Sequence, residues 1–135
     1  MMTGELLPYA QYVIYFTAGF LILPTGRDFI LPGKPILPGD KELLDAMNRD
    51  PIANPCGGFM WRVFGFNFMC ISIVKMMVVS GAMMNFAALF AVADSVGVVL
   101  LATHFAAFKA KKADITPFLA LFILEAAAFI AIVVS

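Results

Sequence analysis

The sequence predicts an all-α integral membrane protein, a four-helix bundle with a structured loop between its first two helices. Composition is the first observation: hydrophobic residues make up 62% of the 135 residues and charged residues only 13%, about half the charged share of an average soluble domain. The second is a mean hydropathy of +0.94. The third is that four apolar stretches are each long enough to cross about 30 Å of hydrocarbon. This composition argues against a soluble enzyme, a disordered chain and a secreted disulfide scaffold.

The four spans are bounded by helix-breaking residues. Pro24 is expected to stop the first span, because a proline removes a helical hydrogen bond. The second ends at Ser80 and Gly81, and a short turn leads into the third. The fourth starts near Pro117, since proline is favoured in the first turn of a helix. The predicted spans cover residues 6–23, 59–79, 84–108 and 117–134.

Charge placement predicts how these spans are oriented. Nine Lys and Arg residues balance nine Asp and Glu residues, so no basic excess points to nucleic acid. The basic residues outside the spans lie in only two loops: Arg27, Lys34, Lys41 and Arg49 in the first, and Lys109, Lys111 and Lys112 in the third. Because these two loops share one side, the positive-inside rule places them on the cytoplasmic, stromal or matrix side, with both termini opposite.

The first loop has a short repeat that predicts a stiff segment. The repeat reads Leu-Pro-Thr-Gly at 23–26 and Leu-Pro-Gly at 31–33 and 37–39. Pro followed by Gly fits the two central positions of a type II turn. After the last turn, Asp40 is expected to cap a short helix over about 41–49. That helix either rests on the membrane surface or docks a partner.

Three ionisable residues are predicted to lie well inside the membrane. Asp94 and Glu125 fall roughly 12–15 Å deep, and Lys75 lies on the second span. Because the connecting turn is short, the second and third spans are expected to be antiparallel neighbours that bring Lys75 to Asp94. Two acids sharing one base predict one ionised carboxylate and one neutral carboxyl. The cluster is either a polar clamp that fixes helix packing or a proton relay.

Two further polar residues are candidate site residues near the span ends. Arg62 is expected to extend its side chain to the headgroups. His104 is a candidate axial ligand for chlorophyll or haem. The other side chains that could hold magnesium are those of Gln11, Asn67, Asn85 and Glu125. No span carries the paired Glu and Arg motif of light-harvesting antenna proteins, so pigment binding by that pattern is not expected.

Sequence motifs for catalysis are missing from the chain. A single His, and two Cys without a CxxC spacing, argue against a multi-ligand metal site. The sequence has no Gly-rich phosphate loop and no GxSxG or HExxH motif. We therefore expect neither catalytic nor metal-site residues, and a protein that is not an enzyme. Chlorophyll, carotenoid and bound lipid stay open as cofactors.

Taken together, these features predict a small accessory subunit that packs into and stabilises a larger membrane complex. Membrane lipid and other integral membrane subunits are the expected partners. An energy-converting assembly of photosynthesis or respiration, in the thylakoid or inner mitochondrial membrane, is preferred because such assemblies recruit many small helical subunits. The alternative is a proton-coupled small-solute carrier or channel that uses Lys75, Asp94 and Glu125. A third option is a lipid-binding or quinone-binding protein with its pocket between spans.

Overall fold

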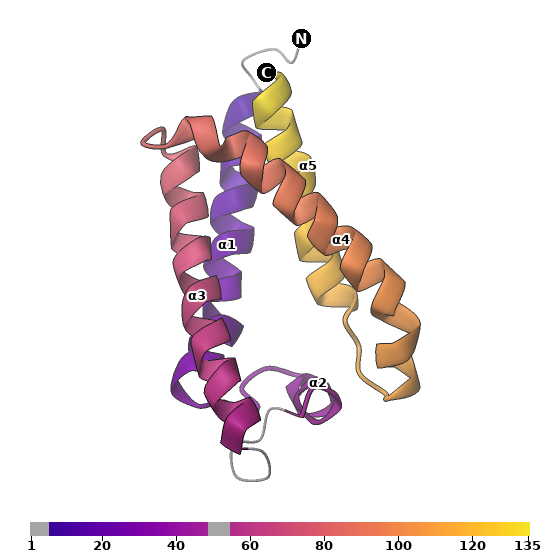
Figure 1. The fold of residues 1–135 in the computed structure, drawn as a ribbon. Helices are drawn as coiled ribbons and strands as arrows, with labels where there is room; N and C mark the ends of the chain where they lie inside the picture. The colour runs from indigo at the N-terminus through magenta and orange to yellow at the C-terminus, as the bar shows by residue number, and fades with distance from the viewer. Residues whose placement is uncertain (1–5, 49–54) are drawn as a thin grey trace.

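The computed structural model describes residues 6–48 and 55–135, and within these ranges the regular structure is helical. Four of the helices are long and apolar enough to cross a membrane, so the chain is an all-α four-helix bundle of the multi-pass membrane type (Figure 1). The elements in chain order are α1 (Leu6–Ile30), α2 (Asp40–Ala46), α3 (Pro55–Val79), the short 3₁₀ helix η1 (Met84–Phe86), α4 (Ala87–Ala110) and α5 (Thr116–Val134).

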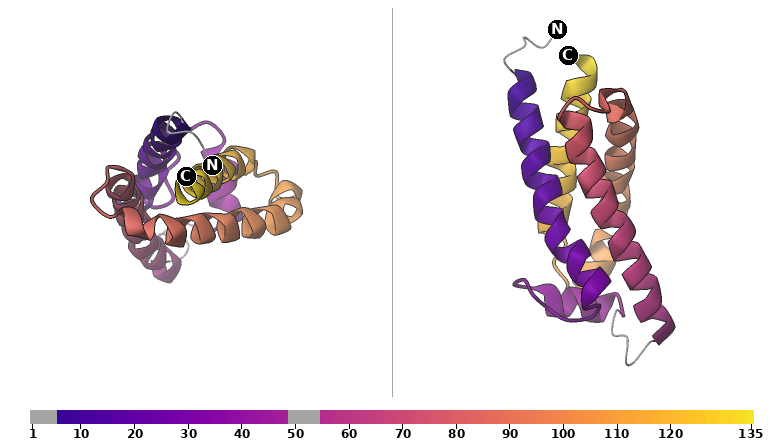
Figure 2. Two further views of the ribbon diagram at one scale, coloured as in Figure 1. Left: turned by 90° about the horizontal axis from the view of Figure 1, so that it is seen from above. Right: turned by 90° about the vertical axis from the view of Figure 1, so that its left-hand side faces the viewer.

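The long helices associate as two pairs. Helix α1 packs along α3, α4 packs along α5, and α1 also packs against α5 (Figures 1 and 2). The start of α1 and the end of α5 lie at one end of the bundle, while α2 and the α4–α5 connection lie at the other. The two loops richest in basic residues are therefore at the same end.

The expectation that the second and third spans are close antiparallel neighbours is wrong for most of their length. Helices α3 and α4 meet beside the connecting turn and then diverge (Figure 1). Helix α3 instead packs along α1, and α4 packs along α5. A short turn therefore determines only that the two helices start close together.

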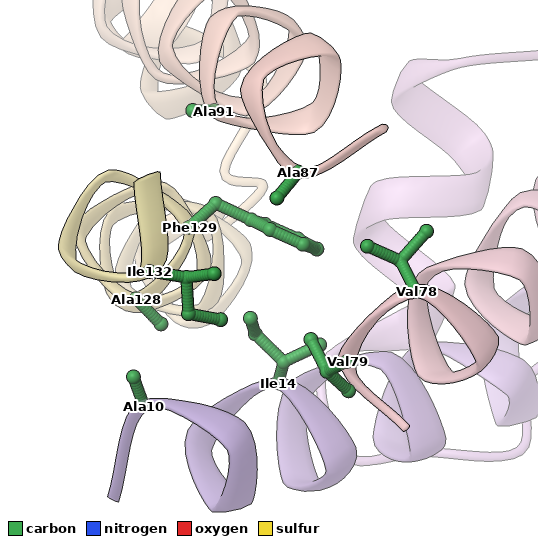
Figure 3. Packing of buried hydrophobic residues seen from close by; sticks show 9 residues of the cluster. All are labelled: Ala10, Ile14, Val78, Val79, Ala87, Ala91, Ala128, Phe129 and Ile132. Carbon is green, nitrogen blue, oxygen red and sulfur yellow. The ribbon is translucent and has the colours of Figure 1, made fainter. Parts of the chain in front are cut away.

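Apolar side chains close the bundle at the end where all four long helices meet. The Phe129 ring is fully buried and stacks against Phe90 with ring centroids 5.5 Å apart. Around it lies a cluster of small and branched residues: Ala10, Ile14, Val78, Val79, Ala87, Ala91, Ala128 and Ile132 (Figure 3). A smaller cluster of Leu43, Ala113 and Ile115 packs α2 against the α4–α5 connection. The second cluster attaches the first loop to the rest of the bundle.

Helix α1 continues past Pro24 to Ile30, so the predicted end of the first span is wrong. Pro24 removes one backbone donor and leaves the carbonyl of Phe20 without its helical hydrogen bond, a loss that transmembrane helices tolerate. In the same turn, Thr25 Oγ1 donates to the carbonyl of Leu21 at 2.7 Å. The first Leu-Pro-Thr-Gly unit is thus helical and forms no turn.

The other two Pro-Gly units form the turns that the sequence predicts. Gly33 and Gly39 adopt positive φ angles of 83° and 81°. Lys34 N donates to Leu31 O, and Asp40 N donates to Leu37 O, both at 3.1 Å. Proline sets the first central position of each turn and glycine accepts the positive φ of the second. The loop is therefore rigid at two points.

The short helix of the loop differs from its prediction over 41–49. It spans Asp40–Ala46, and Asn48 has a positive φ of 52° that is incompatible with further helix. Asp40 does not cap it: the N-cap position is Gly39, which makes no side-chain capping bond. Asp40 Oδ2 accepts instead from the backbone N–H groups of Ile36 and Leu37, both at 2.9 Å. Arg49 lies outside the described residues.

The connection into α5 is organised by Asp114. Its Oδ1 accepts the backbone N–H of Thr116 at 2.9 Å, which satisfies a donor that the first turn of a helix leaves free. These hydrogen bonds from Thr116 hold the pKa of the exposed Asp114 carboxyl below its ordinary value. Because the pKa is lowered, the stabilising effect of Asp114 is present at neutral pH and is lost only under acidic conditions.

Two glycines allow helices to approach closely. A Cβ atom at Gly65 would lie 2.6 Å from Thr25 O and 2.7 Å from Phe29 N, both backbone atoms of α1. A Cβ atom at Gly97 would lie 2.8 Å from the Phe122 ring of α5. Small residues at such positions favour transmembrane helix packing, because they let backbones come together.

Replacing Gly65 with alanine is expected to lower the free energy of unfolding by about 1–3 kcal/mol, because α1 backbone atoms cannot move aside easily. Gly19→Ala is the matched control, since nothing lies within 4 Å of a Cβ atom there. The control is expected to be neutral or to gain up to about 1 kcal/mol of helix propensity. Thermal unfolding in detergent measures both, and equal midpoints would contradict the close packing of α1 on α3.

Candidate functional site

The structure brings Lys75, Asp94 and Glu125 into direct contact, and we call this cluster the intramembrane triad. Lys75 Nζ donates to Asp94 Oδ1 at 2.6 Å and also to Glu125 Oε1. The side chains are 7%, 3% and 0% exposed in the order Lys, Asp, Glu. One ammonium group therefore joins α3, α4 and α5 inside the bundle.

The position of the triad follows from the way α3 and α4 diverge. Lys75 is one turn from the end of α3, and Asp94 is two turns into α4, so both lie near the connecting turn where the two helices are still close. Glu125 comes from the middle of α5, which packs along α4. The rings of Phe90 and Phe122 lie 5.6 and 5.8 Å from Lys75 Nζ. They add a favourable cation–π contact in a site without access to bulk water.

The triad contains more acid than base. Asp94 Oδ2 and Glu125 Oε2 are buried and have no hydrogen-bond partner in the part of the chain that the structure describes. Two ionised carboxylates beside one ammonium would leave a net negative charge in a low-dielectric interior, which is strongly unfavourable. A proton on one of the two carboxyls removes this charge. The geometry therefore provides both a tight clamp and a place for one proton.

A second buried ionic cluster, formed by Arg27, Asp28 and Asp40, was not predicted from the sequence. Arg27 Nε lies 2.8 Å from Asp28 Oδ1, and Arg27 Nη1 lies 2.6 Å from Asp40 Oδ2. The Arg27 side chain is 1% exposed. We call this group the loop cluster, because it ties the end of α1 to the start of α2.

The predicted end of the first span at Pro24 makes Arg27 a basic residue of the first loop. Once α1 is known to continue to Ile30, Arg27 lies inside the helix and needs a buried partner. The adjacent Asp28 is the sequence signal that could have indicated this. Asp40 carried no such signal, since only the folding back of the loop brings it to Arg27.

The remaining predicted site residues lie on the outside of the bundle. Arg62 is exposed near the start of α3, a position compatible with the predicted contact to headgroups. His104 is exposed on α4, with Nδ1 2.8 Å from the carbonyl oxygen of Leu100. Nδ1 also lies 3.2 Å from Thr103 Oγ1. Because a carbonyl only accepts, Nδ1 is the donor to Leu100, and Nε2 of the neutral ring would be the nitrogen left to bind a ligand. His104 therefore keeps the chemistry of an axial ligand.

The other candidate magnesium ligands are separated from His104 or engaged elsewhere. Gln11 Nε2 donates to Val79 O at 2.9 Å, and Asn67 Nδ2 donates to Val63 O at 2.8 Å. Asn85 is exposed in η1, and Glu125 belongs to the triad. Among the residues that the structure describes, no three His, Cys, Asp or Glu side chains are grouped to hold a metal ion.

A cavity of about 230 Å³ lies between the two ionic clusters. Arg27 and Asp28 line one part of it and Lys75 another, and α2, α4 and α5 also contribute to its wall. Most of the lining is apolar and includes Phe64, Phe118 and Phe122. Cavities with such walls tend to exclude water.

The Lys75→Met variant is expected to lose about 3–5 kcal/mol of stability, because it leaves two carboxyls buried without their cation. The triple variant Lys75→Met, Asp94→Leu, Glu125→Met removes the whole ionic group and is expected to recover most of that loss. Thermal unfolding in detergent compares the two, with the exposed Lys109→Met as the neutral control. A single variant as stable as the control would contradict a stabilising role for the triad.

Replacing Asp40 with asparagine is expected to cost about 1.5–3 kcal/mol, because the charge facing Arg27 is lost. Asp45→Asn lies on the same short helix but is exposed, so its expected effect is within about 0.5 kcal/mol. Limited proteolysis of the first loop provides a second measurement, since Asp40 holds α2 to α1. Equal cleavage of the two variants would argue against the loop cluster as the attachment point.

Comparisons with known proteins give no family assignment for this chain. No protein-family model matches it, and neither a curated protein nor a solved structure shows significant similarity to it. Function must therefore be argued from the helices, the two ionic clusters and the surfaces around them.

Proposed function

We propose that this chain is a small accessory subunit that packs into and stabilises a larger membrane protein complex. The observation that carries the proposal is a shallow apolar groove of about 430 Å³ along α4 and α5. Ala91 and Ser95 line the groove, and Val96 and Ile130 contribute to its apolar walls. Small residues one turn apart are typical of transmembrane helix interfaces, because they permit close backbone approach.

Helix α4 supports this interpretation because only a small share of its residues is buried within the described bundle. Within its most apolar stretch, 17% of the residues are buried, compared with 28–33% for the other three spans. Ser95 Oγ donates to the carbonyl of Ala91 at 2.6 Å. This bond lowers the free-energy cost of placing the serine hydroxyl against another apolar helix. The proposed occupant of the groove is a transmembrane helix of a neighbouring subunit.

The two ionic clusters fit a structural role, with no catalytic step assigned to the chain. Each joins elements that apolar packing alone would leave free to slide, α3, α4 and α5 in one case and α1 and α2 in the other. Directional ion pairs specify one arrangement among many apolar alternatives. A subunit held in one shape can then present a constant surface to its complex.

We also propose in which membrane the chain lies and which way it faces. The first and third loops carry the Lys and Arg residues outside the spans and lie at one end of the bundle, so we place that end on the cytoplasmic, stromal or matrix side. An energy-converting complex of photosynthesis or respiration, in the thylakoid or inner mitochondrial membrane, is the assembly we prefer. The preference rests on how commonly such complexes recruit small helical subunits. In that setting the Nε2 of His104 faces outward, where it could reach a chlorophyll or haem of the assembly.

Native gel electrophoresis after mild-detergent solubilisation tests the proposal. The tagged chain is expected to migrate with a large complex, and a coloured or redox-active band would identify an energy-converting assembly. Val96→Trp, which puts a bulky ring into the groove, is expected to release the chain. Tyr12→Trp changes an exposed residue of α1 and is expected to leave migration unchanged. A free monomer or homo-oligomer for the unaltered chain would refute the subunit assignment.

The unpartnered carboxyl oxygens of the triad favour one alternative, a proton-coupled carrier or channel. Asp94 Oδ2 and Glu125 Oε2 have no partner in the described chain, so either could carry a proton for exchange. Reconstitution into vesicles separates the two functions. If Asp94→Asn abolished proton-coupled solute flux while thermal stability and complex assembly stayed unchanged, the carrier would replace the accessory subunit.

A further inference from the structure

We propose that a hollow between the end of α4 and the start of α5 binds the headgroup of an anionic glycerophospholipid, with the phosphodiester between Lys109 and Lys112. The hollow has a volume of about 340 Å³ and shares no residue with the groove proposed for a neighbouring helix. Lipid binding there needs no partner subunit, so it goes beyond the proposed role in a complex. The lining residues are Phe105, Lys109, Lys112, Ala113, Asp114 and Thr116.

The backbone around the hollow is held in place by buried neighbours. Ala113 and Ile115 are 4% and 2% exposed and pack with Leu43 of α2 in the smaller apolar cluster. Lys112 and Asp114, which alternate with them along the chain, are exposed. Packing therefore fixes the α4–α5 connection (Figure 1), and the hollow is preorganised before a ligand arrives.

Lys112 has a backbone conformation that glycine would adopt at lower cost. Its φ is 60°, in the left-handed region that residues with a Cβ atom rarely occupy. The N–H groups of Lys112 and Ala113 donate to Lys109 O and Phe108 O, both at 3.0 Å, at the end of α4. A lysine at a position where glycine would be less strained indicates that its side chain has a use.

The hollow lies where the hydrocarbon of the membrane gives way to the headgroups. The apolar run of α4 ends at Phe108, and Lys109 follows directly. Phe105, one turn earlier, is half-buried and supplies an apolar part of the wall. The ligand must therefore be polar at one end and apolar at the other. Basic pockets between transmembrane helices at this level bind the headgroups of anionic lipids.

The charges around the hollow favour a ligand with one negative charge. Lys109 and Lys112 contribute two formal positive charges and Asp114 one negative charge, which leaves a net charge of +1. Asp114 Oδ1 accepts the N–H of Thr116 at 2.9 Å, and the lowered pKa of Asp114 keeps it ionised at neutral pH. One phosphodiester neutralises this net charge. A zwitterionic headgroup leaves the charge unbalanced, and a headgroup with its own carboxylate would be repelled by Asp114.

Native mass spectrometry of the full chain in detergent tests the site with two lipids that have the same acyl chains. Dioleoyl phosphatidylglycerol carries one net negative charge, and dioleoyl phosphatidylcholine carries none. We expect one retained phosphatidylglycerol per chain and about tenfold weaker retention of phosphatidylcholine. Equal retention of the two lipids, or the lack of a saturable one-to-one complex with phosphatidylglycerol, would overturn the site.

Two adjacent lysines provide the matched variants. Lys111 and Lys112 are both exposed in the α4–α5 connection, but Lys111 does not line the hollow. Lys112→Gln is expected to weaken retention of phosphatidylglycerol about tenfold, and Lys111→Gln less than about twofold. Both variants lose the same charge. Equal losses would therefore show attraction by overall basic charge and would refute a site between Lys109 and Lys112.

The Lys112→Gly variant separates lipid binding from stability. Glycine relieves the left-handed backbone conformation, so the thermal midpoint in detergent is expected not to fall. Retention of phosphatidylglycerol is expected to fall about tenfold, as it does for Lys112→Gln. A lowered midpoint with the lipid preference intact would show that Lys112 has only a structural role, contrary to the proposal.

A soluble phosphate ester is the other source of the same chemistry. Glycerol phosphate is added in competition with phosphatidylglycerol. We expect no displacement up to about a hundredfold excess, because the acyl chains that keep the lipid at the membrane level of the hollow are missing. Displacement at an equal concentration would assign the hollow to a soluble phosphate ester and overturn the lipid.

Discussion

The buried ammonium group of Lys75 is the constraint on which the arrangement of the bundle depends. A charge inside a membrane protein must be matched by an opposite charge, because neither lipid nor apolar side chains can replace its hydration. Asp94 and Glu125 provide that match from two other helices. The helices α3, α4 and α5 must therefore meet at one level, and apolar side chains such as Phe129 pack around a geometry that the ion pairs define.

The loop cluster applies the same principle near the membrane surface. Arg27 bonds Asp28 in its own helix and Asp40 at the start of α2, and Asp40 also organises the turn that precedes it. Together with the two Pro-Gly turns, this cluster folds the first loop back across one end of the bundle. The loop cluster thus joins α1 to α2, and the intramembrane triad joins α3, α4 and α5. The cavity lies between these two clusters.

Divergence of α3 from α4 links this architecture to function. A bundle closed along its whole length would present only an apolar exterior to lipid. Here α4 leaves the α1–α3 pair, so it exposes a groove on its outer side and opens a cavity on its inner side. Both features arise because each helix of the central turn has its main packing partner elsewhere. The groove and the cavity are therefore both consequences of this divergence.

Composition and local pattern by themselves determined the class of the protein, its four apolar spans and the two Pro-Gly turns, because these features depend on hydrocarbon thickness and on the backbone freedom of Pro and Gly. The same information singled out Lys75, Asp94 and Glu125, since few ionisable residues lie deep in the spans. Only the tertiary structure decided that α1 passes through Pro24, that α3 leaves α4, and that Asp40 reaches Arg27. The reason is physical: whether a helix continues through a proline depends on its surroundings in the folded protein, and which helices pack together depends on how well their whole faces fit. An ion pair between distant residues forms only after both choices have been made.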